Sequence, residues 1–273
     1  MIWGGSSCRR GGPSHAIDDG GHRGASVSRP RTAPAFYPPG VDASGRLPAS
    51  PNLLPADALR SERCAGYETD RPDVQFHVPR SARTILDLGC SSGSLGAALK
   101  RRQPSTVVGV EPVAEYARDA AERLDRVFAV DVESFLSGPA PAEAPFDCLI
   151  AADVLEHLVD PWQVLSQAAE LLRPGGTAVI SLPNVAYWHG LLRFVRDGRW
   201  PLDDQGVFDR THLRWFTRDD ALDLLQQAGL RPVVVEPRYW ASGWRSKWRL
   251  LAERTPLDRF LAPQYVISAI RVV

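Results

Sequence analysis

The sequence predicts an α/β fold in which helices cover both faces of a doubly wound, mostly parallel sheet of seven strands. Two observations support this class. Strand-like and helix-like segments alternate from Tyr67 to the end of the chain, and the first strand leads directly into a turn of small residues. Chains that alternate in this way form parallel sheets buried on both faces. We expect the last strand to run antiparallel to its neighbours.

The strand-like segments are short apolar runs rich in β-branched residues, at 84–88, 106–110, 126–130, 146–151, 177–182, 231–236 and 264–272. Helical patterns lie between them, at 94–102, 113–123, 161–172, 185–196 and 218–228. Pro104 and the pair Gly175-Gly176 mark breaks, because proline and glycine interrupt regular structure. Thr217, three residues before Asp220, is a capping signal for the last of these helices.

The turn after the first strand is the most informative stretch of the chain. Residues 84–96 read Thr-Ile-Leu-Asp-Leu-Gly-Cys-Ser-Ser-Gly-Ser-Leu-Gly, an apolar run that breaks into small residues and continues as a helical pattern. Such a turn brings bare backbone close to a ligand and directs the free N–H groups of a helix N-terminus towards it. The next apolar run ends at Glu111, where an acid is placed to bind the two hydroxyls of a ribose. Together they predict a nucleoside-containing cofactor.

Small or acidic residues stand at or just past the ends of four predicted strands: Gly89, Glu111, Asp131 and Asp153. In open parallel sheets, ligands bind at the carboxyl ends of the strands, where the strand order reverses. These positions therefore indicate a ligand site along one edge of the sheet.

The composition excludes several classes of protein. The 273 residues carry no net charge, so nothing points to nucleic acid as a partner, and 44% are hydrophobic, enough for a packed core. The four cysteines, none in C-x-x-C spacing, fit free thiols in a reducing compartment, so we expect a cytoplasmic protein. No apolar run reaches the ~18 residues that a membrane span requires.

Residues 1–66 differ in character from the rest of the chain. They are rich in Gly, Pro, Ser and Arg and show no sustained periodicity, so they cannot bury enough apolar surface to offset the entropy of ordering. We expect a disordered N-terminal tail over 1–66 and one folded domain over 67–273.

The motifs of this domain resemble the class I S-adenosylmethionine-dependent methyltransferases. The segments similar to the cofactor-side motifs of that family are 85–93, 108–111, 130–133, 146–157 and 171–177. Two further stretches, 182–184 and 209–217, resemble a bacterial subgroup similar to the ubiquinone-biosynthesis-type methyltransferases. The resemblance implies a Rossmann-like sheet, S-adenosyl-L-methionine as cofactor, and transfer of its methyl group.

The resemblance also implies how the first turn binds the cofactor. Asp87 attracts the methionine ammonium, and backbone groups of Gly89, Cys90 and Gly93 line the methionine half of the pocket. Ser91 is also expected to contact the cofactor, although it departs from the family, which usually has a second glycine here. A serine fits if its φ is negative, but its backbone then approaches the cofactor less closely.

The other cofactor roles fall on the later strand ends. Glu111 accepts hydrogen bonds from the ribose hydroxyls. Asp131 accepts from the adenine amine, and Val132 donates its N–H to the adenine ring. Asp153 lies over the methionine end of the pocket.

The candidate catalytic residues are His157, His212 and Asp209. His157 follows Asp153 by four residues, so both side chains can face the cleft from one helical turn. A histidine titrates near neutrality and can remove a proton from a hydroxyl acceptor. Asp209 is placed either to orient His212 as a base or to form a structural ion pair with Arg210.

We expect a small-molecule acceptor methylated on oxygen: a sugar, a quinone-like ring or another secondary metabolite.

A metal is a weaker alternative for the same region. Asp153, Glu156 and His157 resemble an acid–acid–His pattern that holds a divalent metal in some quinone-type relatives. Two carboxylates and one imidazole would hold magnesium only with several added waters. We expect no bound metal.

Aromatic residues gather in two insertions, near 183–217 and 238–263. Trp240, Trp244 and Trp248 in the second insertion fall at i, i+4 and i+8, a single stripe on a helix. The insertions form a lid and an acceptor pocket, or they pack their aromatic face on the domain. For the tryptophan stripe we favour packing on the domain. Peripheral membrane contact through that stripe and its basic neighbours is a third interpretation.

Two other functions compete with methyl transfer. The G-x-S-x-G spacing of 89–93 also matches the nucleophile elbow of α/β-hydrolases, with Ser91 as nucleophile and Asp153 and His212 in the chain order of a triad. However, a hydrolase needs several strands before its nucleophile, and the sequence upstream of 89–93 predicts too few. A hydrolase would also give no role to Glu111. The second alternative is a non-catalytic protein that keeps the cofactor fold. The polar residues Asp153, His157 and His212 argue against it.

Overall fold

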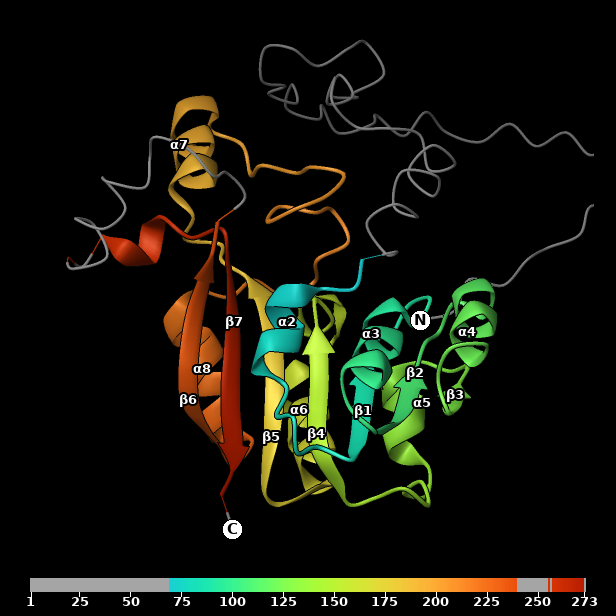
Figure 1. Cartoon of the computed structure of the whole chain (residues 1–273). Helices are drawn as coiled ribbons and strands as arrows, with labels where there is room; N and C mark the ends of the chain where they lie inside the picture. The colour runs from blue at the N-terminus through green and yellow to red at the C-terminus, as the bar shows by residue number, and fades with distance from the viewer. Residues whose placement is uncertain (1–68, 240–254, 256, 273) are drawn as a thin grey trace, which may run out of the picture. The chain divides into compact units, whose positions relative to one another are not determined.

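The computed structural model describes residues 69–239, 255 and 257–272 (Figure 1). Its centre is a seven-stranded sheet with the strand order β3-β2-β1-β4-β5-β7-β6. Strands β1 to β5 pair in parallel, and β7 runs antiparallel between β5 and β6. The strands are Thr84–Leu88, Thr106–Val110, Arg126–Phe128, Phe146–Ala152, Leu172–Pro183, Leu230–Arg238 and Gln264–Arg271, numbered β1 to β7. The predicted fold class, including the antiparallel last strand, is confirmed.

Helices pack on both faces of this sheet and divide the core into two parts. One face carries α2 (Pro72–His77), α3 (Ser94–Arg102) and α4 (Ala114–Ala121), and the other carries α5 (Val132–Ser137), α6 (Pro161–Glu170) and α8 (Arg218–Gln227). Because side chains alternate across a strand, Ile85 of β1 lies in the first core, and Leu86 and Leu88 lie in the second. All three are fully buried.

The starts of two helices follow from their capping residues. The Thr217 side chain and the Asp220 carboxylate each accept a hydrogen bond from the other residue's backbone N–H, so the predicted capping signal of α8 is confirmed as a complete capping box. Asp160 accepts from the N–H of Gln163 at 3.0 Å and precedes Pro161, which needs no hydrogen-bond acceptor at the first helical position.

The predicted elements are present, with boundaries that differ by a few residues. β5 begins earlier than predicted, at Leu172, and α2 and α5 were not predicted, because six-residue helices carry too little periodicity to be recognised. The described residues also include two short 3₁₀ turns, η1 (Leu155–His157) and η2 (Asp258–Phe260). The proposed tail 1–66 and the stripe of Trp240, Trp244 and Trp248 lie outside the described residues, so the division at residue 67 stays a prediction.

The segments that follow β5 are held at the sheet by one buried residue, Asn184. Asn184 is fully buried; its side-chain NH₂ group donates to the carbonyls of Arg259 and Ala262 at 2.8 and 2.7 Å, and its oxygen accepts from the N–H of Ala186 at 3.1 Å. Its backbone also forms a bridge with Phe216. Through its side chain and its backbone, Asn184 therefore joins three stretches of chain at the carboxyl end of β5.

Helix α7 (Trp188–Asp197) packs against the loop that follows it through Gly190. A Cβ at this position would lie 1.8 Å from Cε2 of the buried Phe208 ring. Alanine is favoured over glycine in a helix by ~1 kcal/mol, but the displaced ring costs ~1–3 kcal/mol. We expect Gly190→Ala to lower the free energy of unfolding by about 1 kcal/mol, measured by urea denaturation.

The exposed neighbour His189 provides the control for this substitution. His189→Ala should change the stability by less than ~0.5 kcal/mol, as is usual for surface positions. A Gly190→Ala protein as stable as the parent would show that Phe208 does not hold α7.

Candidate active site

The turn after β1 is held by the end of β2. The N–H groups of Gly89 and Cys90 both donate to the carbonyl of Val110, at 2.8 and 3.1 Å. Gly109, the preceding residue of β2, makes room for the thiol, because a Cβ there would lie 2.5 Å from Sγ of Cys90. Burial raises the pKa of the Cys90 thiol, which therefore stays protonated.

Two glycines in this turn are required by geometry. Gly89 has a φ of +68°, and a Cβ there would meet Cγ2 of Val154 at 2.5 Å. Gly93 has a φ of +80° at the start of α3, and its Cβ would lie 3.0 Å from Cα of Ala120. Glycine adopts positive φ at no steric cost. Both glycines are therefore required by the close packing of the turn against Val154 and Ala120.

Asp87 lies near the end of β1, almost completely buried at 2% exposure. Its Oδ2 atom has no hydrogen-bond partner. Burial, together with the charge of Glu111, raises the pKa of Asp87 to about 7. A buried carboxylate without a donor is costly, and a cationic ligand would offset that cost. The residue therefore fits the ammonium group of a bound amino acid.

Glu111 follows β2 and is also buried. One carboxylate oxygen accepts from the N–H of Ser91 at 3.0 Å, and the other accepts from the N–H of Val113 at 2.9 Å. Burial raises the pKa of Glu111 despite these two donors. The side chain thus braces the turn after β1, and each oxygen keeps a second lone pair for a ligand hydroxyl.

Ser91 does not meet the condition under which a serine was expected to fit. Its φ is +50°, in the left-handed region that favours glycine. Its Oγ atom is buried and has no hydrogen-bond partner. A hydrolase nucleophile needs a base within hydrogen-bond reach, and none contacts this hydroxyl in the described part of the chain.

Asp131 and Val132 lie at the start of α5. Asp131 is the helix N-cap, and its Oδ1 accepts from the N–H of Ser134 at 2.7 Å. This bond lowers the pKa of Asp131. Val132 is buried in the core beneath. The exposed acid therefore has a structural role here, whether or not it also contacts adenine.

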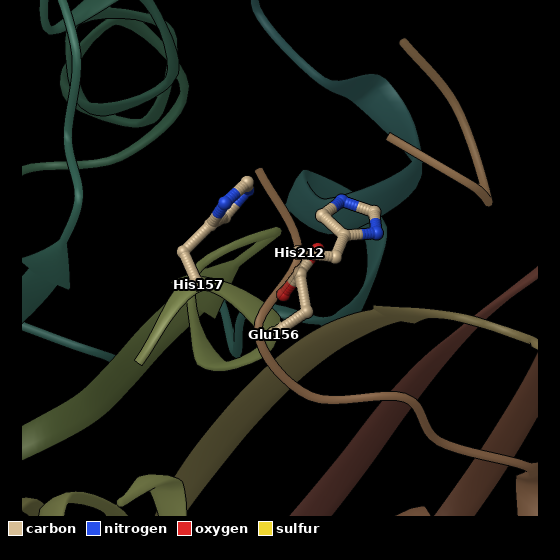
Figure 2. A group of neighbouring side chains, drawn as sticks. All are labelled: Glu156, His157 and His212. Carbon is tan, nitrogen blue, oxygen red and sulfur yellow. The ribbon is translucent and has the colours of Figure 1, made fainter. Parts of the chain in front are cut away.

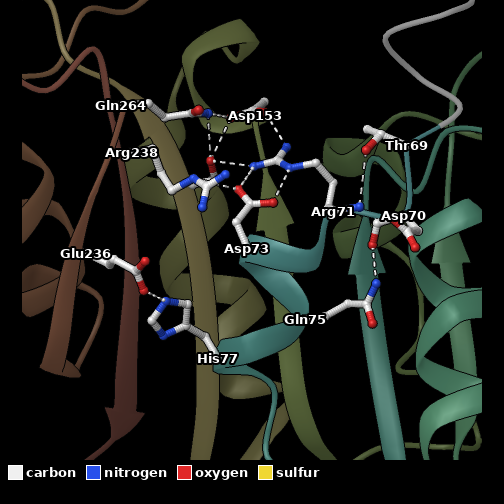
Figure 3. A network of polar contacts seen from close by, with 11 residues as sticks. Thr69, Asp70, Arg71, Asp73, Gln75, His77, Asp153, Glu236, Arg238 and Gln264 are labelled. Atoms are coloured by element: carbon white, nitrogen blue, oxygen red, sulfur yellow. Dashed lines mark hydrogen bonds and ion pairs between the residues drawn. The ribbon is translucent and has the colours of Figure 1, made fainter. Parts of the chain in front are cut away.

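Asp153 sits in a network of polar contacts at the carboxyl ends of β4 and β5 (Figure 3). One carboxylate oxygen accepts from the Arg71 guanidinium at 2.5 Å, and the other accepts from Ser181 Oγ at 2.8 Å and Gln264 Nε2 at 2.5 Å. Asp153 also has a positive φ, of 60°. These contacts place it at the predicted edge of the sheet and hold it there.

Arg71, which was not predicted from the sequence, joins α2 to this network. It precedes α2 with a φ of 46°, and its guanidinium also contacts Asp73 at 3.1 Å. Two further contacts join α2 to β6: an ion pair between Asp73 and Arg238 at 3.4 Å, and a hydrogen bond between His77 Nε2 and the Glu236 carboxylate at 2.9 Å (Figure 3). No local pattern marks Arg71, because its partner Asp153 is 82 residues away in sequence.

The predicted acceptor-side histidines meet over η1. The backbone N–H groups of Leu213 and Arg214 both donate to the carbonyl of Glu156, at 2.8 and 3.0 Å, which brings the 209–217 loop onto η1. The rings of His157 and His212 then lie edge to face, with centroids 4.8 Å apart (Figure 2). The structure therefore brings together two residues that are 55 positions apart in the sequence.

A buried carboxylate lies beside the two rings (Figure 2). Glu156 is 1% exposed, and its Oε2 has no hydrogen-bond partner. Burial and the charge of Asp153 raise the pKa of Glu156. Glu156, His157 and His212 each offer a ligand atom, and these atoms lie within 4.8 Å of one another. They are metal-ligand types, but the trio differs from the predicted pattern, because His212 takes the place of Asp153.

His212 is held in one orientation and kept neutral. Its Nδ1 lies 3.1 Å from the carbonyl of Val207, which fixes the proton on Nδ1 and leaves Nε2 as an acceptor. Burial, and then the neighbouring His157 ring, lower the pKa of His212 to about 4. The imidazole is therefore unprotonated across the neutral pH range.

Asp209 braces the loop that carries His212. Its Oδ1 accepts from both the backbone N–H and the hydroxyl of Thr211, at 2.8 and 2.7 Å. The His157 ring approaches the same Thr211, with Nδ1 at 3.3 Å from its carbonyl and from its hydroxyl. Arg210 pairs with Asp204 at 3.0 Å. Asp209 thus acts on the histidines through Thr211, and its catalytic role stays a prediction.

Aromatic side chains extend from the histidine pair towards α7. His212 contacts Trp215, with ring centroids 5.5 Å apart, and Trp215 contacts Trp200 and Phe208 at 5.2 and 5.7 Å. An apolar groove of about 480 Å³ lies between α7 and residues 257–261. The aromatic side chains belong to the first predicted insertion, and the groove combines residues of both insertions. Within the described ranges, no helix combines the length and the apolar character needed to cross a membrane.

Comparisons with known proteins agree with the predicted methyltransferase fold. A family model for a methyltransferase domain matches residues 59–235. A ubiquinone biosynthesis O-methyltransferase of Ruegeria pomeroyi is 29% identical over 219 residues, which cover 75% of this chain and 79% of that protein.

Solved structures share the fold at low sequence identity. A SAM-dependent methyltransferase from Archaeoglobus fulgidus superposes with a TM-score of 0.54 at 18% identity, covering 78% of this chain and 96% of that one. The [4+2]-cyclase SpnF superposes with a TM-score of 0.51 at 19% identity, covering 75% and 82%. Because the fold also serves a cyclase, the fold alone does not decide the reaction.

The sequence match covers more than half of the chain and supports methyl transfer over the competing functions. The chain belongs to the methyltransferase domain family, and it is an S-adenosylmethionine-dependent methyltransferase.

Proposed function

We propose that this enzyme methylates a hydroxyl oxygen of a small, ring-containing molecule such as a sugar, a quinone-like ring or another secondary metabolite. The observation that carries this proposal is the pair His157 and His212 beside the buried Glu156 carboxylate. Hydroxyl acceptors must lose a proton during methylation, and this pair provides a neutral imidazole to accept it. The name of the Ruegeria pomeroyi relative, an O-methyltransferase, is compatible with an oxygen acceptor.

The residues at the ends of β1 and β2 fit the cofactor. Asp87 provides an unpartnered carboxylate oxygen for the ammonium group. The backbone of Gly89, Cys90 and Gly93 is proposed to line the methionine half. Glu111 keeps two lone pairs for the ribose hydroxyls. Asp131 and Val132, at the start of α5, are proposed to bind adenine, and Asp153 to close the methionine end.

The proposed chemistry needs only a weak base. When bound, S-adenosylmethionine supplies a methyl group that leaves its sulfur when a nucleophile attacks in line. The protein must hold the acceptor oxygen in that line. As the oxygen gains the methyl group its proton becomes strongly acidic, so Nε2 of His212 can accept it although the pKa of His212 is about 4. His157, in ring contact with His212, is proposed to bind the acceptor beside it.

The surroundings favour an acceptor with a ring or an apolar part. Trp215 lies against His212, and the rings of Trp200 and Phe208 continue this surface. Aromatic faces stack on planar rings and on the C–H faces of sugars. The expected cytoplasmic location and the absence of a nucleic-acid partner stay predictions.

The oxygen acceptor is tested with methyl-labelled S-adenosylmethionine and a panel of phenols, catechols and glycosides. We expect label on an oxygen of at least one compound. His212→Ala should lower kcat for that compound by ~10²–10⁴-fold, the usual contribution of a general base, while the Kd for S-adenosylhomocysteine is unchanged. Between pH 6 and 8, kcat should not fall on acidification, because the pKa of His212 is about 4.

His189→Ala is the matched control, since His189 is exposed on α7. Label found on nitrogen or carbon would contradict an oxygen acceptor. Full turnover by His212→Ala would remove His212 as the base.

Cofactor binding should depend on pH through Asp87. Its pKa is raised to about 7 in the free protein, and an ammonium group binds only the ionised carboxylate. Affinity for S-adenosylhomocysteine should therefore increase as the pH rises from 5.5 to 7 and then level off. Calorimetry in two buffers of different ionisation enthalpy should detect proton release in the same range.

Asp87→Asn keeps the shape of the side chain and removes the titrating group. Its affinity should be weak and nearly independent of pH in this range. Equal pH dependence in Asp87→Asn and the parent would place the ammonium elsewhere.

Glu111→Ala should weaken S-adenosylhomocysteine binding by ~1–3 kcal/mol, the scale of a lost hydrogen bond to a charged group. The exposed Glu115 of α4 provides a matched acid, and Glu115→Ala should bind with the parent's affinity. An unchanged Kd for Glu111→Ala, measured by calorimetry, would refute the ribose assignment.

A further inference from the structure

The backbone is strained at the point where β4 leaves the sheet. Asp153, the first residue after β4, has a φ of 60°, in the left-handed region that is unfavourable for residues other than glycine. Such a conformation persists only where its surroundings enforce it, and strain of this kind is a reason to look for function. The groups that enforce it are therefore candidates for a role in the site.

Asp153 affects the turn after β1 through its neighbour in the chain. Val154 packs directly on that turn, because a Cβ added to Gly89 would lie 2.5 Å from Cγ2 of Val154. The backbone N–H of Asp153 donates to the carbonyl of Ser181 at 3.1 Å, so the direction in which the chain continues depends on the conformation of Asp153. A change at Asp153 would therefore shift the turn that is proposed to line the methionine half of the cofactor.

Three side chains of the described structure hold the Asp153 carboxylate (Figure 3). Ser181 Oγ and Gln264 Nε2 are neutral and donate to one oxygen, at 2.8 and 2.5 Å. The Arg71 guanidinium donates to the other oxygen at 2.5 Å and brings a positive charge. Hydrogen bonds between charged groups are about twice as strong as those between neutral groups. Arg71 is thus the strongest of the three restraints.

Arg71 is itself clamped by α2. Its Nε and Nη2 atoms donate to the two carboxylate oxygens of Asp73, both at 3.1 Å, and Nη2 also donates to Ser181 Oγ at 3.1 Å. Only 18% of the Arg71 side chain is exposed. A planar guanidinium held in this way loses little further freedom when it binds a second carboxylate. The docking of α2 is therefore linked to the conformation of Asp153.

We propose that Arg71 is a positioning residue for the cofactor site: by binding the Asp153 carboxylate it holds the end of β4 in its strained conformation and so keeps the turn after β1 in place. Arg71 acts through Asp153 and needs no contact of its own with the cofactor. This role rests on the cofactor site proposed above. It also makes that site depend on α2, a helix whose sequence carries none of the cofactor motifs.

The test separates the backbone conformation at position 153 from the side chain that enforces it. Glycine adopts a positive φ at no steric cost, so Asp153→Gly should keep the present path of the chain without the ion pair. S-Adenosylhomocysteine binding is measured by calorimetry on the parent, Arg71→Gln, Asp153→Gly and the double variant. Arg71→Gln should bind about tenfold more weakly than the parent. In the Asp153→Gly background, the same change should alter the Kd by less than about twofold.

Arg71→Lys tests the geometry of the contact. It keeps the positive charge but lacks the planar fork that bridges Asp153 and Asp73. Its affinity should lie between those of the parent and Arg71→Gln. If circular dichroism shows that Arg71→Gln does not fold, Arg71→Lys takes its place in the comparison, with an expected loss of about threefold in the parent background and none in the Asp153→Gly background.

Arg238→Gln is the matched control. Arg238 also pairs with Asp73, at 3.4 Å, so its loss removes an ion pair of α2 but none of the three donors to Asp153. The variant should melt at a lower temperature and bind S-adenosylhomocysteine with the parent's affinity. A merely structural role for Arg71 would give this same result for Arg71→Gln.

Parent-like affinity of folded Arg71→Gln would overturn the proposal. An equal loss in both backgrounds would overturn it as well, because Arg71 would then act by a route other than Asp153. If Asp87→Asn and Glu111→Ala weaken binding in either case, the cofactor site stands and only the role of Arg71 fails. If none of these variants weakens binding, the site itself has been placed wrongly.

Discussion

The active site depends on the attachment of one turn to the neighbouring strand. Gly89 and Cys90 donate to the last carbonyl of β2, and Ser91 donates to the carboxylate that follows it. Gly109 completes the contact by making room for the Cys90 thiol. These bonds fix where β1 ends, where α3 begins and how far Asp87 stands from Glu111. Two carboxylates are thereby buried side by side, a costly arrangement that a cationic, hydroxyl-rich ligand relieves.

The acceptor side is built in a different way. Here no strand end holds the reacting groups directly; the carbonyl of Glu156 binds two N–H groups of the 209–217 loop, and this brings His212 to His157. Asp209 supports the same loop through Thr211. The geometry of the candidate base therefore depends on loop packing, and the cofactor groups depend on the sheet.

This difference explains what could be predicted from the sequence. The strands, most helices and the glycine turn follow from periodicity and local residue types, which act over a few positions. Arg71 and the polar contacts of α2 could not be predicted, because they join residues far apart in the chain. The ion pair of Arg210 with Asp204 was also not foreseen from the sequence. The conformation of Ser91 was equally hidden, because a serine gives no sign of a positive φ.

Asn184 has a consequence for how such an enzyme diversifies. Its side chain binds the residues before β7 and its backbone pairs with Phe216, whereas the turn after β1 is held by the last carbonyl of β2. Changes at well-separated anchors combine almost independently. The segments proposed to bind the acceptor can therefore change in sequence without altering the contacts that hold the turn after β1.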